Sequence, residues 1–299
     1  MEKNFYYKNL NNTNKIQASM NKFGLSIIEN YFNVSTLSKI LNDVKLKLNE
    51  VKYVNPAKNI KKAEELGDNF RQENNRIKYN LTKNQLKKGL RYYSKLTNQI
   101  SIKNPLINIK DLKKIVFDEN LIDFADRYLK TESKLGDVKI GCHLKNDLPE
   151  NCINFFHTDA QNKFKAKDFN SKKLIKDNDI LKVIIPLKGD NEYNHILKRK
   201  DYFKNVPQYF NFTEMRPEVK KYLVKPILKK GDFLIIDGTN FFHQAESPKS
   251  EIRVILYITF IKKNKMKYYD LKLLKKDYKK LSVKQRNFFS FHNQYYSSN

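Results

Sequence analysis

A histidine and an aspartate lie two residues apart in the segment INFFHTD, at His157 and Asp159. The alternation of apolar and polar residues in this segment predicts a β-strand, and alternate side chains of a strand lie on the same face. The imidazole and the carboxylate then project to one side, about 6 to 7 Å apart along the chain. This arrangement suits chelation of a metal ion, although the same spacing also arises often by chance.

A second histidine strengthens this interpretation. His243 follows the segment GDFLIIDGTNFF, in which a buried strand ends at a turn containing Asp237 and Gly238. A histidine at this point can project back toward the preceding strands. Two imidazoles and one carboxylate that leave three positions of the metal open are the ligands typical of non-haem Fe(II) oxygenases. We therefore predict that His157, Asp159 and His243 bind Fe(II), with the open positions taken by a bidentate 2-oxo acid and O2.

Arg253 is the third candidate, ten residues beyond His243 and at the start of the strand segment RVILYITF. A planar guanidinium binds a carboxylate through two parallel hydrogen bonds. An arginine buried near the metal therefore suits the distal carboxylate of 2-oxoglutarate. The alternative is a surface position, in which Arg253 pairs with Glu246 or Glu251.

The first half of the chain has mainly helical spacing. The segment 23–32 predicts a short strand, and the segment 51–110 is polar and ambiguous, with leucines at 81, 86 and 90 that hint at further helix. Helices are predicted just after this strand and over 119–130. Their buried stripes comprise Leu37, Ile40, Leu41, Val44 and Leu48 in the first, and Leu121, Phe124, Ala125, Tyr128 and Leu129 in the second.

From residue 135 onward the spacing changes to that of strands, predicted over 137–145, 153–159, 181–187, 232–237 and 253–260. Helices followed by strands indicate an α+β fold with a jelly-roll-like core. We expect a single oxygenase domain over 1–299. Its parts are a mainly helical segment 1–134, a β core 135–261 with a lid-like insert 189–230, and a basic tail 262–299, whose leucines at 271, 273 and 274 suggest a peripheral helix.

The chain is strongly basic, with 59 Lys and Arg against 32 Asp and Glu and a formal net charge of +27. Clustered lysines bind polyanions such as nucleic acid. Here the lysines are spread along the whole chain. Their excess accompanies many Asn, Ile, Phe and Tyr and few Gly, Pro and Trp, which is typical of an AT-rich coding sequence. We interpret the charge as a solvated surface, and an anionic small molecule stays among the substrates that fit.

Two further features concern the cellular setting. No apolar run is long enough for a transmembrane helix, and residues 1–15 hold no stretch typical of a signal peptide. We therefore expect a cytoplasmic protein without a membrane span. The two cysteines, Cys142 and Cys152, lack the spacing of metal ligands and are interpreted as small buried apolar residues.

Together these motifs resemble the phytanoyl-CoA dioxygenase family of Fe(II)/2-oxoglutarate oxygenases. The resemblance runs from Phe23 to Phe260 through FGLSIIENYF, VFDENLIDFADRYL, FFHTD, ILKVIIPL and GDFLIIDGTNFFH with the following arginine. It implies a double-stranded β-helix, a cupin-like jelly roll, with the N-terminal helices packed outside. It also implies metal ligands at His157, Asp159 and His243 and a 2-oxoglutarate clamp at Arg253.

The substrate pocket is less defined by the sequence. Its candidate residues border the expected mouth of the core and are His143, Lys182, Tyr193, Asn194 and Arg216. The two remaining histidines, at 195 and 292, lie in polar segments and are expected to be exposed.

We predict a dioxygenase that hydroxylates a small molecule with release of succinate and CO2. Three alternatives remain open. One is a cupin-type metalloenzyme that does not use 2-oxoglutarate and does not need Arg253. Another is a basic nucleic-acid-binding protein in which the histidine and aspartate pair is fortuitous. The third is an enzyme that modifies nucleic acid or protein. The sequence does not identify the substrate, because one fold serves many reactions.

Overall fold

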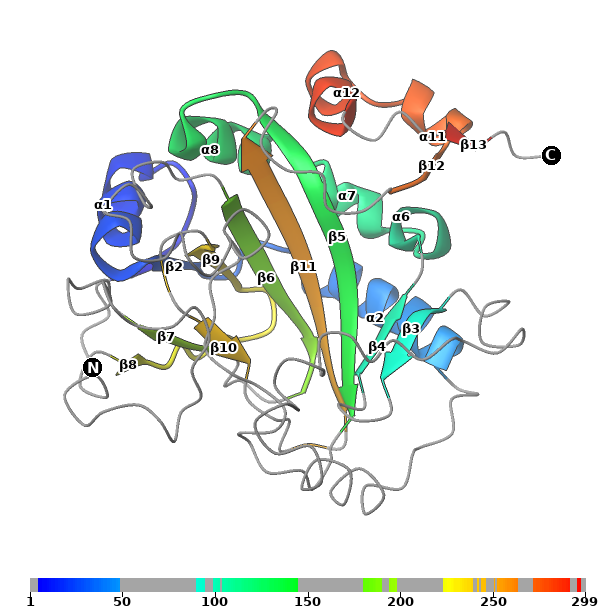
Figure 1. Cartoon of the computed structure of the whole chain (residues 1–299), viewed down its shortest axis with the longest axis horizontal. Helices are drawn as coiled ribbons and strands as arrows, with labels where there is room; N and C mark the ends of the chain where they lie inside the picture. The colour runs from blue at the N-terminus through cyan, green and yellow to red at the C-terminus, as the bar shows by residue number, and fades with distance from the viewer. Residues whose placement is uncertain are drawn as a thin grey trace, which may run out of the picture.

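The computed structural model (Figure 1) describes a large part of the chain. The described residues are 5–48, 90–94, 99–102, 104–144, 180–189, 194–197, 223–238, 241, 243–245, 250, 252–262, 271–290 and 295–296.

The largest element is an eight-stranded sheet with the order β1-β2-β9-β6-β11-β5-β4-β3, antiparallel except for the β1–β2 pair. Its long central strands run side by side through the middle of Figure 1. The bounds of the eight strands are β1 (Tyr6–Tyr7), β2 (Leu25–Ile28), β3 (Leu90–Ser94), β4 (Gln99–Ile102), β5 (Ser133–Leu144), β6 (Ile180–Lys188), β9 (Phe233–Asp237) and β11 (Ile252–Lys262).

The described part of the chain also contains two smaller sheets. One has the order β10-β7-β8 and lies at the lower left of Figure 1. Its strands are β7 (Asn194–Leu197), β8 (Leu223–Val224) and β10 (His243–Ala245). The other pairs β12 (Leu273–Leu274) with β13 (Tyr295–Tyr296) near the C-terminus.

The helices within the described residues cover one face of the large sheet, here called the helix face. They are α1 (Thr13–Phe23), α2 (Val34–Leu48), α6 (Pro105–Asn108), α7 (Leu112–Val116), α8 (Glu119–Leu129), α11 (Lys275–Lys279) and α12 (Val283–Phe289). The apolar stripes of α2 and α8 pack with residues such as Val183 and Leu256 in one large core cluster. A hydrogen bond from the Tyr128 hydroxyl to Asp237 Oδ2, 3.1 Å long, ties α8 to the end of β9.

The opposite face of the sheet, here called the inner face, carries a second apolar cluster. Leu234 and Ile236 of β9, Ile184 of β6 and Ile255 of β11 belong to it. Val224 of β8 belongs to the same cluster, so the small sheet packs against the inner face. Both faces of the central strands are therefore covered, which explains why β6 and β9 have continuous apolar sequences.

Most of the predicted elements are confirmed. The two predicted helices are α2 and α8, and their apolar stripes are buried in the core except for Leu48, which is partly buried at the end of α2. Asp118 caps α8, because its carboxylate accepts a hydrogen bond from the backbone N–H of Leu121 at 2.9 Å. The strands predicted at 137–145, 181–187, 232–237 and 253–260 are β5, β6, β9 and β11. The strand predicted at 153–159 lies outside the described residues.

Three predictions of local structure were wrong. Leu90, taken as a hint of helix, begins strand β3 at the edge of the large sheet. The insert 189–230, predicted as loops, contributes β7 and β8 to the small sheet, and its other parts are described only at 189 and 225–230. In the tail, the predicted peripheral helix is present as the short, solvated α11, but Leu271 and Leu273 do not belong to it: they precede it in an extended segment and are buried. Tertiary packing decided each case, because short segments carry too little periodicity of their own.

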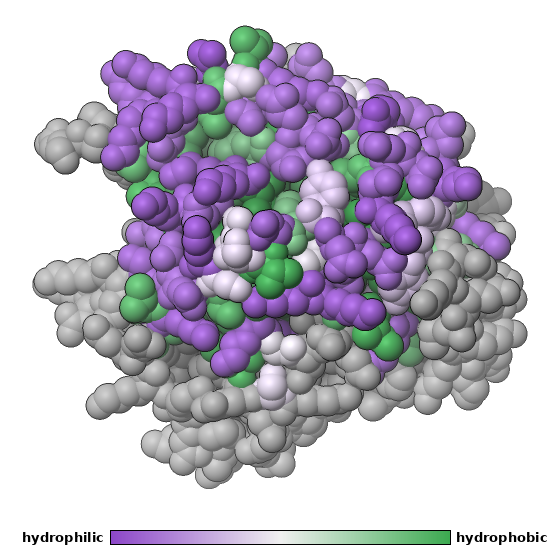
Figure 2. All heavy atoms as spheres, turned by 180° about the vertical axis from the view of Figure 1, so that it is seen from behind, coloured by the Kyte–Doolittle hydropathy of each residue, from purple (hydrophilic) through white to green (hydrophobic). Residues whose placement is uncertain are grey.

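The surface agrees with the composition. Figure 2 shows one side of the molecule dominated by hydrophilic side chains, with apolar side chains scattered among them. Within the described ranges, no helix is long and apolar enough to cross a membrane. Cys142 is fully buried in β5, as predicted, and burial raises the pKa of its thiol to about 12. Cys152 lies outside the described residues.

Candidate active site

Arg253 lies on the inner face near the start of β11, and its side chain is only 1% exposed. The alternative surface position is therefore wrong. Gly189, at the end of β6, makes room for it: a Cβ built on Gly189 would lie 2.9 Å from the Cα of Arg253 and 3.0 Å from its Cβ. Gly189 has a φ of +111°, a conformation that side-chain-bearing residues rarely adopt. This glycine lets the chain pass beside the arginine without displacing it.

His143 is the residue directly opposite Arg253 on the neighbouring strand β5. Directly opposed residues of an antiparallel pair project to the same face, so both side chains lie on the inner face. Two residues earlier, Gly141 lies beneath two rings. A Cβ built there would lie 3.0 Å from Nε2 of His143 and 3.2 Å from Cε2 of Tyr257. Gly141 thus allows both rings to lie close to the backbone of the sheet.

The environment of His143 disfavours the charged form of its imidazole. Burial lowers its pKa well below the usual value of 6.5, and the positive charges of Arg253 and Lys139 lower it further. His143 is therefore neutral at pH 7, so one ring nitrogen carries a proton and can donate a hydrogen bond, while the other can accept one.

His243 begins β10 in the small sheet and is 5% exposed. Its Nδ1 lies 3.3 Å from the carbonyl oxygen of Phe241. A carbonyl oxygen only accepts, so this hydrogen bond requires the proton on Nδ1, and in a neutral imidazole the lone pair is then on Nε2. Metal-binding histidines commonly make this second hydrogen bond, which fixes the ring and its tautomer.

The position of Phe241 itself depends on a glycine near the start of the chain. Gly24 ends α1 with a φ of +78°, and a Cβ built on it would lie only 2.1 Å from the ring of Phe241. The ring, 3% exposed, therefore rests directly on the Gly24 backbone. The Asp237 N–H donates to the Gly24 carbonyl at 3.0 Å, and the Phe241 N–H donates to the Asp237 carbonyl at 3.3 Å. These contacts fix the turn that leads to His243.

The other predicted site residues divide into two groups. Lys182 of β6 lies half-buried on the inner face, opposite Thr259. Asn194 is paired with Ala245 in the small sheet, two residues from His243 along β10. The remaining four, His157, Asp159, Tyr193 and Arg216, lie outside the described residues. Among the residues that are described, no group of three His, Cys, Asp or Glu could hold a metal ion.

The described part of the predicted site nevertheless fits an iron and 2-oxo acid centre. The Nδ1 of His243 is within hydrogen-bond distance of a carbonyl, as in most metal-binding histidines, and Arg253 is a buried guanidinium, a group suited to bind a carboxylate. His143 lies beside that guanidinium. The sequence motifs named Arg253 and His243 as candidates, but they did not reveal Gly24, Gly141 and Gly189. Their only sequence signal was a glycine next to or inside a strand.

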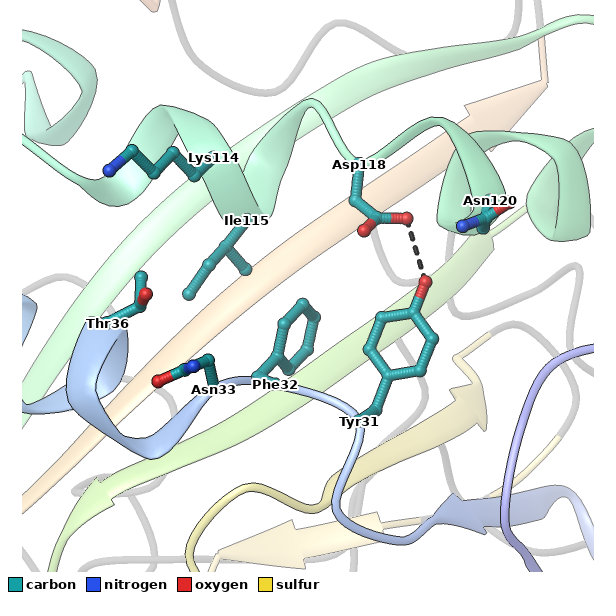
Figure 3. Close-up of a pocket in the computed structure, with 8 residues that line it drawn as sticks. All are labelled: Tyr31, Phe32, Asn33, Thr36, Lys114, Ile115, Asp118 and Asn120. Carbon is teal, nitrogen blue, oxygen red and sulfur yellow. Dashed lines mark hydrogen bonds between the residues drawn. The ribbon is translucent and has the colours of Figure 1, made fainter.

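Two surface hollows lie elsewhere. Figure 3 shows one of about 360 Å³ on the helix side, between the loop before α2 and the connection from α7 to α8. There the Tyr31 hydroxyl donates to Asp118 at 2.9 Å, and burial, together with the Asp118 charge, raises the pKa of Tyr31. Because Asp118 also caps α8, these polar groups have a structural explanation. The second hollow, about 570 Å³, contains the ion pair of Lys113 with Asp277 at 2.8 Å. Neither hollow contains a residue predicted for the site.

Comparison with known proteins gives matches among solved structures. No protein-family model and no curated protein sequence matches the chain. The epimerase SnoN from nogalamycin biosynthesis, described as non-heme and α-ketoglutarate dependent, matches with a TM-score of 0.51 and 9% sequence identity, covering 85% of this chain and 84% of its own. The chain shares the fold of SnoN. A complex of SnoN with Fe³⁺, α-ketoglutarate and nogalamycin RO gives the same values. AviO1 from Streptomyces viridochromogenes Tue57 matches with a TM-score of 0.47 and 9% identity, over 85% of this chain and 96% of its own.

Proposed function

We propose that this protein is an Fe(II)- and 2-oxoglutarate-dependent dioxygenase that hydroxylates a small molecule. The observation that carries the proposal is the burial of Arg253 on the inner face, against which the sheet that holds His243 packs. A guanidinium buried in an apolar surrounding binds a carboxylate more strongly than an exposed one does, because the low local polarity strengthens the charge pair. The distal carboxylate of 2-oxoglutarate matches the planar fork of such a group.

The fold supports the same class of enzyme. SnoN, which shares it, is described as dependent on α-ketoglutarate and has been crystallised with Fe³⁺. A large antiparallel sheet backed by helices, with a small sheet packed on its other face, is consistent with a double-stranded β-helix. The narrower resemblance to the phytanoyl-CoA dioxygenase family rests on the sequence motifs and is part of this proposal.

Each residue of the site has a distinct role in this proposal. His157, Asp159 and His243 hold the metal, and the Phe241 carbonyl keeps His243 in the tautomer that coordinates through Nε2. Arg253 binds the distal carboxylate of 2-oxoglutarate and thereby orients its 2-oxo acid end. The apolar inner face around Ile255 excludes water from this pair, which strengthens it.

When bound, Fe(II) supplies the redox chemistry by which 2-oxoglutarate and O2 become succinate and CO2 while a substrate C–H becomes C–OH. Hydroxylation is the reaction that we propose here, whereas SnoN is described as an epimerase. Mass spectrometry of the product distinguishes the two, because hydroxylation adds one oxygen atom and epimerisation adds none. A screen of candidate small molecules for stimulated succinate formation identifies the substrate.

The decisive test removes the guanidinium. We expect Arg253→Leu to weaken 2-oxoglutarate binding by about 2 to 5 kcal/mol, which is roughly 30-fold to several thousand-fold. Arg253→Lys should lie between, because the charge stays while the bidentate fork is lost. Iron affinity should change little. The matched control is Lys262→Leu, which removes a positive charge from the other end of the same strand.

The measurements are anaerobic titrations of Fe(II) and of 2-oxoglutarate with wild type and the three variants. Tight 2-oxoglutarate binding by Arg253→Leu would show that Arg253 is not the clamp, whereas a wild-type protein that binds no 2-oxoglutarate would favour a metalloenzyme that does not use this cosubstrate. Replacing either His157 or Asp159 with Ala should abolish the weak visible absorption that Fe(II) and 2-oxoglutarate produce together. Full retention of that band in both variants would contradict the assignment of the metal ligands.

A further inference from the structure

The inner face has a second hydrogen-bonding side chain close to a carboxylate that would bind at Arg253. His143 is the direct cross-strand neighbour of Arg253, and both side chains project from the same face of the β5–β11 pair. Side chains in such positions have Cβ atoms about 4.5 to 5.5 Å apart. A ligand group that contacts the guanidinium of Arg253 is therefore within reach of the His143 imidazole.

The residues around His143 hold its ring in one orientation and leave its Nε2 atom available to a ligand. Its Nε2 atom is buried and has no hydrogen-bond partner among the residues that the structure describes. A buried polar atom that stays without a partner costs about 1 to 3 kcal/mol. The ring lies against Gly141 next to the Tyr257 ring, so the glycine and the second ring fix where Nε2 points.

The neutral state of the His143 ring determines which hydrogen bonds it can make with a bound carboxylate. Burial, Arg253 and Lys139 keep the pKa of His143 well below 6.5, so the imidazole adds no second cation beside the guanidinium. It supplies a single N–H donor. A carboxylate has about four lone-pair sites, and a bidentate arginine uses two of them. Room remains for one further donor on the other side of the carboxylate.

We propose that His143 donates a hydrogen bond from Nε2 to the distal carboxylate of 2-oxoglutarate, beside the pair that this carboxylate makes with Arg253. The inference rests on the proposed function and assigns to His143 a role in selecting the cosubstrate. It makes the clamp two-sided, with one residue from β11 and one from β5. Selectivity for a 2-oxo acid with a distal carboxylate then depends on both residues.

The test compares two 2-oxo acids that differ in this carboxylate, namely 2-oxoglutarate and 2-oxobutyrate. We expect His143→Ala to weaken 2-oxoglutarate binding by about 10- to 150-fold, the effect of a hydrogen bond to a charged group. Binding of 2-oxobutyrate and of Fe(II) should stay at the wild-type level. His143→Gln keeps an N–H donor and should recover part of the loss. Thr259→Val, on the same face of β11 but six residues from Arg253, is the matched control and should bind both acids like wild type.

A measurement on the wild-type ring makes the test independent of whether a variant folds. In Zn(II)-substituted protein, a slowly exchanging His143 Nε2–H signal should appear in nitrogen-proton NMR spectra when 2-oxoglutarate is added. It should be absent with 2-oxobutyrate. Appearance of the signal with both acids, or with neither, would overturn the proposal.

The outcomes also separate this inference from the proposed function. If wild type does not bind 2-oxoglutarate at all, the proposed function fails and the inference fails with it. If wild type binds 2-oxoglutarate and Arg253→Leu weakens it, the proposed function stands. In that case, unchanged 2-oxoglutarate binding by His143→Ala, or an equal loss for both acids, would overturn the role of His143 alone.

Discussion

A single methyl group at Gly24 should disturb both the stability of the protein and the position of His243. Gly24 has a φ of +78°, so an alanine there acquires about 1 to 2 kcal/mol of backbone strain. The added Cβ would also overlap the Phe241 ring, whose nearest atom lies at 2.1 Å. No rotation of a methyl group relieves such an overlap, so the ring has to leave its place.

The size of the effect follows from the burial of that ring. Phe241 is 3% exposed, and loss of a buried phenylalanine side chain destabilises a protein by about 3 to 5 kcal/mol. This is the upper bound of the overlap contribution, because the displaced ring keeps some contacts. Gly231→Ala is the matched control. Gly231 also has a positive φ, +100°, but a Cβ built on it would lie 3.2 Å from its nearest neighbour, the carbonyl oxygen of Phe32.

The assay is denaturant unfolding of wild type, both glycine variants, Phe241→Ala and the Gly24→Ala/Phe241→Ala double variant. We expect Gly24→Ala to lower the free energy of unfolding by clearly more than Gly231→Ala. In the double variant the overlap is gone, so the combined loss should be much smaller than the sum of the two single losses. Additive effects in this cycle would refute the contact between Gly24 and Phe241.

The same variant should weaken metal binding, because the Phe241 carbonyl holds His243 through Nδ1. Loss of such a supporting hydrogen bond typically lowers metal affinity about 10- to 100-fold. Titration of the folded Gly24→Ala protein with Co(II) measures this. Wild-type affinity in a folded but destabilised Gly24→Ala variant would show that Phe241 does not position His243.

Three further predictions concern other parts of the structure. Cys142 should not react with a disulfide reagent at pH 8 in a Cys152→Ser background until denaturant unfolds the protein, because burial raises the pKa of its thiol to about 12; rapid labelling of the folded protein would contradict this. Folding lowers the pKa of His143, so below pH 6.5 the unfolded chain binds more protons at this residue than the folded chain does. The contribution of His143 to the free energy of unfolding should therefore be fully present above pH 6.5 and should decrease as the pH falls, by at most about 1.4 kcal/mol per pH unit. His143→Gln should flatten this dependence in unfolding measurements, and an unchanged slope would argue against it. Gly189→Ala should weaken 2-oxoglutarate binding while sparing Fe(II), because its Cβ would displace the Arg253 backbone; equal titrations for variant and wild type would exclude the close approach.

Several features of the fold could be predicted from the sequence because they are local. The helices α2 and α8 follow from apolar residues at helical spacing, and both bury nearly all of the stripe that the sequence predicts. The strands β6, β9 and β11 follow from apolar runs of strand length. The face of Arg253 follows from alternation along β11. Each of these properties depends on a few neighbouring residues, which is why periodicity reveals it.

The α+β class is likewise confirmed, because helices cover one face of a large, mainly antiparallel sheet. The roles of His157, Asp159, Tyr193 and Arg216 stay predictions, because these residues lie outside the described ranges.

Only the tertiary structure decided which residues meet at the site. The pairing of Arg253 with His143 depends on the register between β11 and β5, which are far apart in the chain, and a shift of one residue would have turned the histidine to the helix face. The contact of Gly24 with Phe241 likewise joins the end of α1 to the turn before His243. Such contacts arise from the packing of whole elements, so no local pattern specifies them. The sequence shows where the glycines are. Only the assembled sheet shows which side chains pack against each glycine.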